Sequence, residues 1–197
     1  MGKYITLIFV PLIISCIQTT HSKSGEGEKQ TFLDSIFVAN PQFVTDGFDF
    51  PVGKPNAKHY YNAQKFKVNN HLGDDWNGTG GGNTDLGDPI YSIANGYVRQ
   101  AKDEGTGWGN VIRIIHQLPN GTYMESLYAH CQEMKVTQGE LVNRGQKIAT
   151  IGNANGTYYA HLHLEIRTDI DMPLGGGYSS DTAGFVDPTW FIENNRP

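Results

Sequence analysis

Histidine and carboxylate side chains gather in three short segments, of which the first, residues 71–75, reads His-Leu-Gly-Asp-Asp. A loop that contains glycine can turn an imidazole and a carboxylate toward one centre, and Zn²⁺ accepts such a pair of nitrogen and oxygen ligands. Alone this segment is weak evidence, because a turn with solvated acidic residues has the same composition. It marks His71 and one of its two aspartates as candidate metal ligands that need support from elsewhere.

The second segment, residues 160–165, reads Ala-His-Leu-His-Leu-Glu and alternates polar with apolar side chains. If it forms a β-strand, the period of two places His161, His163 and Glu165 on one face and the leucines on the other. Neighbours on that face lie about 6.6 Å apart, a spacing that suits one metal ligand beside one acid–base group. The alternative is a structural pair of histidines with satisfied hydrogen bonds.

The third segment, residues 127–131, reads Leu-Tyr-Ala-His-Cys. Alternation along a strand places Tyr128 and His130 together on one face. All three segments can serve one site only if the fold brings them to one place.

The elements that must do so are short runs of β-branched and aromatic residues, separated by Gly, Asn, Asp and Pro from about residue 41 onward. This spacing predicts an antiparallel all-β domain. We find no internal repeat and no helical periodicity longer than about two turns. The expected strands are Ile90–Ala94, Tyr97–Ala101, Asn110–His116, Tyr123–His130, Gln146–Ile151 and His161–Arg167.

The composition limits the class of protein. With 197 residues, 38% of them apolar, the chain can fill the core of one ordinary domain. Its formal charge of −5 argues against non-specific binding of nucleic acid, which needs clustered Lys and Arg. Two cysteines, Cys16 and Cys131, are too few for a scaffold built from disulfides. We expect a monomer with no nucleic-acid partner.

The start of the chain has the pattern of an export signal. Lys3 precedes an apolar stretch, Tyr4–Ile14, that is shorter than the ~20 residues a membrane-spanning helix needs. The pair Ser15-Cys16 that follows resembles a bacterial lipobox, in which the cysteine is lipidated and becomes the first residue of the mature protein. The alternative is an ordinary signal peptide that is cleaved near residues 19–22.

Three parts are therefore expected: a lipoprotein-type signal peptide over residues 1–15, a flexible tether over 16–40, and a folded domain over 41–197. The expected location is the cell envelope, with a lipid on Cys16 as the membrane anchor. If Cys16 is not lipidated, the protein is secreted.

Taken together, the three segments resemble the lysostaphin-type (LytM-like) zinc metallopeptidases, a family of bacterial cell-wall endopeptidases. The resemblance covers about residues 68–190 and rests on His71 with Asp75, a Tyr-Ala-His element ending at His130, and His-x-His at residues 161–163. Each piece is unspecific, but their common order makes a chance match improbable. Further pieces in the family's order lie at residues 87–96, 108–111, 142–148 and 186–188.

The resemblance implies a fold and a mechanism. The fold would consist of antiparallel sheets forming a sandwich or barrel-sandwich-like peptidase domain with an open groove. The zinc ligands would be His71, Asp75 and His163, with water as the fourth ligand, which is the open arrangement that a catalytic zinc requires. His130 and His161 would be catalytic groups that flank the water and the substrate carbonyl. A histidine base is expected because the His-Glu-x-x-His motif of helical zincins is absent.

Other polar residues near these motifs have less specific interpretations. Glu165 is either a group that orients a liganding histidine or a carboxylate at a strand end. Asp74 stands beside Asp75 and could be the liganding carboxylate in its place. His21, His59 and His116 are most simply non-catalytic.

Two departures from the family pattern affect the substrate more than the metal. Residues 77–85 look like a Gly-rich insertion beside the site, and such loops are often mobile. Tyr158 and Tyr159 precede His-x-His where the family often has small residues and proline, so they could narrow the groove or stack on a substrate. Whether residues 22–60 cover the groove, and which cross-link is cleaved, are left open by the sequence.

The leading hypothesis is an exported zinc metalloendopeptidase that hydrolyses stem or bridge peptides in the cross-links of bacterial peptidoglycan by attack of zinc-bound water. The second is a non-catalytic regulator that binds other murein hydrolases or the wall itself. Loss of a site residue would indicate the regulator, and all five are present. A lipoyl- or biotinyl-like carrier is a third hypothesis, but no lysine stands at a hairpin tip in a suitable context.

Overall fold

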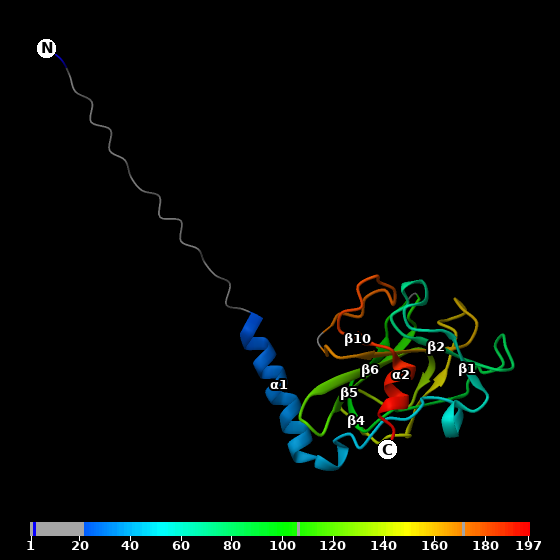
Figure 1. The fold of residues 1–197 in the computed structure, drawn as a ribbon, viewed down its shortest axis with the longest axis horizontal. Helices are drawn as coiled ribbons and strands as arrows, with labels where there is room; N and C mark the ends of the chain where they lie inside the picture. Colours follow the sequence, from blue (N-terminus) through cyan, green and yellow to red (C-terminus); the bar gives the residue numbers. More distant parts are fainter. Residues whose placement is uncertain (1, 3–21, 106, 171) are drawn as a thin grey trace. The chain divides into compact units, whose positions relative to one another are not determined.

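The computed structural model describes residue 2 and residues 22–105, 107–170 and 172–197 (Figure 1). The chain divides into two compact units, residues 1–38 and 39–197. The expected signal peptide, Cys16 and His21 lie outside the described residues. Lipidation and the limits of signal peptide, tether and domain therefore remain predictions.

The described part of the first unit is helical, where the sequence predicted a flexible tether and showed no helical periodicity longer than about two turns. That expectation is wrong, because α1 (Ser22–Ala39) has 18 residues, or about five turns. Leu33 and Phe37, four residues apart, are buried, whereas Phe32 and Val38 are exposed. This short apolar face follows a polar, Gly-containing first half, so its periodicity is too brief to stand out in the sequence. None of the described helices is long and apolar enough to cross a membrane.

The second unit is built from ten strands joined in one sheet. They are β1 (Tyr60–Gln64), β2 (Asp74–Gly78), β3 (Pro89–Tyr91), β4 (Gly96–Asp103), β5 (Asn110–Gln117), β6 (Tyr123–Met134), β7 (Leu141–Val142), β8 (Lys147–Ile151), β9 (Leu162–Arg167) and β10 (Phe185–Val186). The hydrogen-bonded path runs β1-β2-β9-β6-β5-β4-β7, with β10 paired to β9 and β8 paired to both β3 and β6. All the pairs among the described strands are antiparallel. The path starts at β1 and ends at β7, so the sheet is open, and the expected antiparallel all-β class is confirmed.

The predicted strands correspond to β3, β4, β5, β6, β8 and β9, with ends shifted by a few residues. Strand β2 was not predicted, because its sequence Asp-Asp-Trp-Asn-Gly is too short and too polar to show alternation. It is nevertheless the strand that carries Asp75, and its neighbour β9 carries His163.

Strand β9 carries apolar side chains on one face and polar side chains on the other. Its leucines at 162 and 164 and Ile166 belong to the main apolar core. The alternate residues His163, Glu165 and Arg167 leave the opposite face, yet they are buried as well. A buried polar face needs partners for each of its groups, and the loops that cover it supply them.

The described part of this unit also contains four short helical segments: η1 (Pro41–Phe43), η2 (Gly53–Ala57), η3 (Val68–Asn70) and α2 (Pro188–Asn194). Asp187 caps α2 by accepting a hydrogen bond from the backbone N–H of Trp190. Phe48, Phe50 and Val52, which precede β1, pack into the main core.

Candidate metal centre and active site

Two neighbouring strands and one loop bring the predicted metal ligands together. Asp75 in β2 and His163 in β9 are direct partners across the antiparallel pair, so their side chains leave the same face of the sheet. His71 follows η3, where a backbone bridge to Tyr178 holds the loop. The three residues form one group whose ligand atoms all lie within 4.8 Å of one another.

The atoms of this group face one another closely. Asp75 Oδ1 lies 2.9 Å from His163 Nδ1 and 3.3 Å from His71 Nε2, and the two ring nitrogens are 3.0 Å apart. One cation can satisfy a carboxylate oxygen and two imidazole nitrogens that converge in this way. Two nitrogens and one oxygen, with room for a fourth ligand, are a set that catalytic zinc takes. The residues present therefore fit the metal.

Asp74, the alternative carboxylate, lies on the other side of β2. Its Oδ1 accepts a hydrogen bond from the backbone N–H of Phe66 at 3.0 Å. Its Oδ2 accepts from the backbone N–H and the hydroxyl of Thr189, at 2.9 and 2.6 Å. Because neighbours on a strand face opposite ways, Asp74 joins the loop after β1 to helix α2, and Asp75 reaches the metal group. The geometry favours Asp75 as the ligand, and its role remains a prediction.

Glu165 links the metal group, through Arg167, to the loop that follows β9. Its Oε1 accepts from His163 Nε2–H at 3.1 Å, and its Oε2 is paired with Arg167 at 2.6 Å. Arg167 is fully buried and also donates to the carbonyls of Pro173 and Leu174, at 3.0 and 2.9 Å. With its Nε2 proton directed at Glu165, His163 presents Nδ1 as the ligand atom. The structure thus supports an orienting role for Glu165.

Charges around the group favour a cation. Burial alone would raise the pKa of Asp75, but hydrogen bonds from His163 and His71 hold this pKa well below its usual range. Burial would lower the pKa of His163, but Asp75 and Glu165 raise it to about 9. Both anions therefore stabilise a positive charge at His163, whether a proton or a metal ion provides it.

A β-bulge determines the direction of His130. In the pairing of β5 with β6, Tyr128 opposes Ile112 and Cys131 opposes Asn110. Two residues of β6 therefore stand opposite one residue of β5, and His130 adopts a left-handed φ of 59°. Bulges of this kind re-aim a side chain and are common beside active sites.

The expectation that Tyr128 and His130 share a face is therefore wrong. Tyr128 lies in the core, where its hydroxyl accepts a hydrogen bond from the backbone N–H of Ile93 at 2.9 Å. The His130 ring lies on the site, 4.7 Å from the His161 ring and 5.8 Å from the His163 ring between centroids. Simple alternation cannot anticipate this, because it assumes an unbroken ladder.

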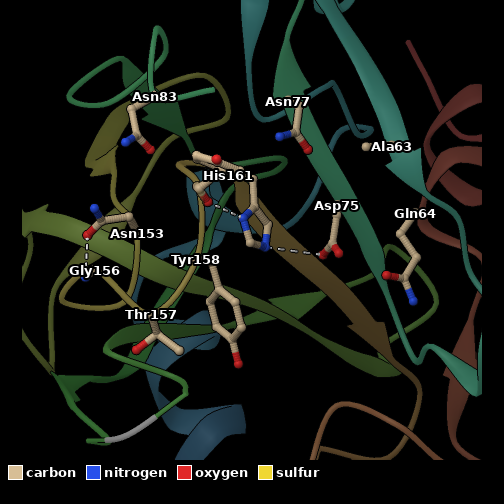
Figure 2. Close-up of a pocket in the computed structure, with 11 residues that line it drawn as sticks. Ala63, Gln64, Asp75, Asn77, Asn83, Asn153, Gly156, Thr157, Tyr158 and His161 are labelled. Atoms are coloured by element: carbon tan, nitrogen blue, oxygen red, sulfur yellow. Dashed lines mark hydrogen bonds and ion pairs between the residues drawn. The ribbon is translucent and has the colours of Figure 1, made fainter. Parts of the chain in front are cut away.

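Both predicted catalytic histidines have one ring nitrogen fixed by a carbonyl. His130 Nδ1 donates to the carbonyl of Trp108 at 3.2 Å, and His161 Nδ1 donates to that of Tyr159 at 2.8 Å. In a neutral ring the proton is then on Nδ1, and Nε2 carries the lone pair. Burial, followed by the charges of His161 and His163, lowers the pKa of His130 to about 3, which keeps it neutral. His161 Nε2 lies 3.8 Å from Asp75 Oδ1 (Figure 2).

The candidate centre opens into two cavities. The larger, of about 690 Å³, extends past His161 and is drawn in Figure 2. The smaller, of about 450 Å³, contains His130 and His163 in its wall. Both are lined by Gln64, Asp75, Tyr158 and His161, so they form one groove that meets at the candidate centre.

The two tyrosines noted in the sequence do line this groove. Tyr158 belongs to both cavities, and its ring centroid lies 5.1 Å from that of His130 and 5.8 Å from that of His161. Tyr159 lines the larger cavity and is 72% exposed. Among the described residues, those that line the groove begin at Ala63. Phe48, Phe50 and Val52 lie in the core instead.

Several residues of the site were missed by reasoning from the sequence. Trp108 and Tyr178 line the smaller cavity, with ring centroids 5.4 Å from His163 and 5.2 Å from His71 respectively. Gln64 lines both cavities, and Arg167 holds Glu165. Trp108 and Tyr178 each stand beside a glycine in a polar loop, where no packed core is expected. This position is the feature by which the sequence could have indicated them as site residues.

Two of the histidines assigned no catalytic part, His59 and His116, lie among the described residues and line neither cavity. His116 is buried between the carbonyl of Asn95, 2.8 Å from Nδ1, and the hydroxyl of Ser126, 2.7 Å from Nε2. Burial lowers its pKa to about 4. His59 is exposed in the loop before β1.

Comparison with known proteins places these observations in a family. The model of peptidase family M23 matches residues 75–174, about half of the chain. Lipoprotein NlpD of Yersinia enterocolitica is 46% identical over 81 residues, which are 41% of this chain and 78% of that protein. Murein hydrolase activator NlpD of Escherichia coli is 43% identical over 81 residues, 41% of this chain and 20% of that protein.

Two further matches cover more of the chain. Peptidoglycan DD-endopeptidase ShyB of Vibrio cholerae is 32% identical over 146 residues, 70% of this chain and 30% of that protein. The solution structure of lysostaphin is 22% identical with a TM-score of 0.50, covering 68% of this chain and 49% of that chain. The latter shows a shared fold. The chain spans only a fifth to a third of the length of the E. coli and V. cholerae relatives.

Proposed function

Since the chain belongs to peptidase family M23, we propose that it is an exported zinc metalloendopeptidase that hydrolyses peptide cross-links of bacterial peptidoglycan. The observation that carries the proposal is the assembly of the metal group with two further histidines, His130 and His161, beside one groove. A binding protein needs the groove alone, whereas hydrolysis needs a metal site and groups that move protons beside it.

His71, Asp75 and His163 would hold the zinc ion. When bound there, zinc supplies Lewis-acid chemistry, which activates a water molecule and polarises an amide carbonyl. Glu165 keeps the His163 ring in the orientation and tautomer that a ligand needs. None of the described residues is hydrogen-bonded to His71 Nδ1, so packing against Tyr178 and the backbone bridge set that ring's orientation.

His130 and His161 would divide the proton transfers between them. Each holds its Nδ1 proton on a backbone carbonyl and offers the Nε2 lone pair, which can accept a proton from the attacking water. Once protonated, such a ring can give the proton to the departing amine or stabilise negative charge on the carbonyl oxygen. The two rings come from different segments, β6 and the loop before β9, so they can act on different sides of the scissile bond.

A non-catalytic regulator is the second candidate, because this chain is similar to proteins named murein hydrolase activators. The match to a peptidoglycan endopeptidase covers more of the chain, and the metal group lies beside both predicted catalytic histidines. These observations favour catalysis. Similarity to a lipoprotein supports, but does not test, a lipid anchor on Cys16 and a place in the cell envelope.

The test is metal analysis of the full-length protein together with mass spectrometry of purified peptidoglycan after digestion. We expect about one zinc per chain and new peptide ends at the cross-links. His161→Ala and His130→Asn should keep zinc and lose about 10²–10⁴ in rate. Asn is chosen at position 130 because it tolerates the left-handed backbone there. The exposed His59, which also has a positive φ, offers a matched control as His59→Asn.

Zinc binding without cleavage would contradict the proposal. If such a protein also stimulated a separately purified murein hydrolase, the regulator would replace the enzyme as its function.

A further inference from the structure

The face of the sheet that carries His163 also carries a chain of buried charges. On this face Arg113 in β5 lies with its Nη2 2.7 Å from Glu125 Oε1 in β6, and its Nε donates to the same oxygen at 2.8 Å. Arg167 Nη1 in β9 lies 3.9 Å from that oxygen, and Arg167 is also paired with Glu165, which accepts from His163. The charges therefore form a path from His163 to Arg113, which stands two strands away from β9.

Side chains of the sheet hold the loop that follows β9 by its backbone carbonyls. Arg113 Nη2 donates to the carbonyl of Met172 at 2.9 Å, and Arg167 donates to those of Pro173 and Leu174. The hydrogen bonds described for residues 172–175 all come from side chains, the last of them from Trp108 Nε1 to the carbonyl of Gly175 at 3.2 Å. Without these donors the described part of this loop would have little to hold it on the sheet.

The far end of the same loop lies against the metal group. The carbonyl of Gly177 accepts a hydrogen bond from the N–H of Leu72 at 2.9 Å, and Tyr178 forms a backbone bridge with His71. The rings of Tyr178 and His71 lie 5.2 Å apart. Gly177 has a φ of 74°, and a Cβ there would lie 3.3 Å from the Trp108 ring, so the loop is packed closely at this point. Because Gly177 and Tyr178 also line the smaller cavity, a shift of this end would move both His71 and the cavity wall.

From these contacts we propose that Arg113 is a positioning residue of the candidate site. It holds the loop at Met172, and through the loop it keeps Tyr178 against His71. An arginine suits this task because its planar guanidinium donates to a carboxylate and a carbonyl at the same time, whereas lysine is a single point charge. The inference rests on the proposed function for the role of the metal, but the position of the loop is tested without it.

Two variants separate this role from a general loss of stability. Arg113→Met removes the bond to the loop, but it also leaves the fully buried Glu125 without its closest partner, so the whole fold should weaken. Arg113→Met combined with Glu125→Gln removes that charge as well. Stability should then largely return, while the bond to Met172 is still missing. Arg144→Met is the matched control, because Arg144 pairs with Asp46 and lines neither cavity.

Hydrogen exchange of the Leu72 amide in the full-length, metal-free protein reports the position of the loop. This N–H belongs to a buried residue and is bonded to the carbonyl of Gly177, so it exchanges when that contact opens. The amide of Ile93, bonded to the hydroxyl of Tyr128 in the core, reports opening of the whole domain. We expect exchange at Leu72 to be about tenfold faster in both variants, the value of one hydrogen bond from a charged donor. Exchange at Ile93 should return to the parent rate in the double variant.

Zinc affinity of the same proteins is measured by competition with a chromophoric chelator. Because Tyr178 holds His71 less firmly once the loop is loosened, both variants should bind zinc about tenfold more weakly than the parent. Arg144→Met should match the parent in exchange and in zinc affinity.

The parent rate of exchange at Leu72 in the double variant would overturn the proposal, because Arg113 would then act on the stability of the fold alone. Faster exchange at Leu72 with unchanged zinc affinity would overturn it too, since the loop would not position His71. A parent protein that binds no zinc would overturn the proposed function, and exchange at Leu72 would still decide whether Arg113 holds the loop.

Discussion

Glu165→Gln is the substitution that best tests how the buried anions tune the metal group. Gln has the same shape and can still accept the Nε2 proton of His163, but it removes one negative charge from a fully buried position. Arg167 then keeps the carbonyls of Pro173 and Leu174, and Glu125 at 3.9 Å, as partners. The fold should therefore survive, and the change should fall on His163.

Two effects of this change oppose each other. Loss of a carboxylate that supports a liganding histidine usually weakens metal binding by about 10- to 100-fold. In the metal-free protein, however, Asp75 and Glu165 raise the pKa of His163 to about 9. Zinc must then displace a proton from this residue at neutral pH, which costs about tenfold in affinity for each pH unit below that pKa.

The variant should therefore differ most from the parent at high pH. Without Glu165 the pKa of His163 falls, so proton competition in the variant begins at a lower pH. We expect the variant to bind zinc about 10- to 100-fold more weakly above pH 9, and the two affinities to approach each other near pH 7. Competition with a chromophoric chelator from pH 6 to 9.5 measures both curves.

Glu133→Gln is the control, because Glu133 is exposed at the end of β6 and pairs with Lys135. It should follow the parent at every pH. If the plots of zinc affinity against pH for the parent and for Glu165→Gln are parallel or identical, the idea that Glu165 acts on the metal through the proton of His163 is refuted.

Three further predictions address other parts of the chain. His163→Ala should abolish retention of zinc, and stoichiometric zinc in that variant would show the ligand assignment to be wrong. In a bacterial host the full-length protein should partition with membranes and incorporate labelled fatty acid, and Cys16→Ala should not. Equal labelling of the two proteins would mean that the chain is exported without a lipid on Cys16. The folded-state pKa of His116, about 4, lies below its unfolded value of about 6.5, so stability should fall by up to about 3 kcal/mol as pH drops through this window. His116→Gln should lose that part of the pH dependence in urea unfolding, and an unchanged slope would contradict the assignment.

Residue types and their order were enough to predict the fold class and to propose five residues of the site. The β-branched runs at β4, β5 and β6 alternate or stay apolar over enough residues to show their period. Helix α1 and strand β2 were missed, because one has only a short apolar face and the other has hardly any. Local pattern is a weak guide where tertiary contacts hold an element in place.

By itself, the sequence determined which side chains are available for chemistry: five residues of the right types, at spacings that resemble one family. Tertiary structure alone decided which of them meet. The pairing of β2 with β9 places Asp75, and not Asp74, opposite His163, and a bulge turns His130 away from Tyr128 and toward His161. Register and bulges depend on partner strands far away in the chain, so no local spacing contains them.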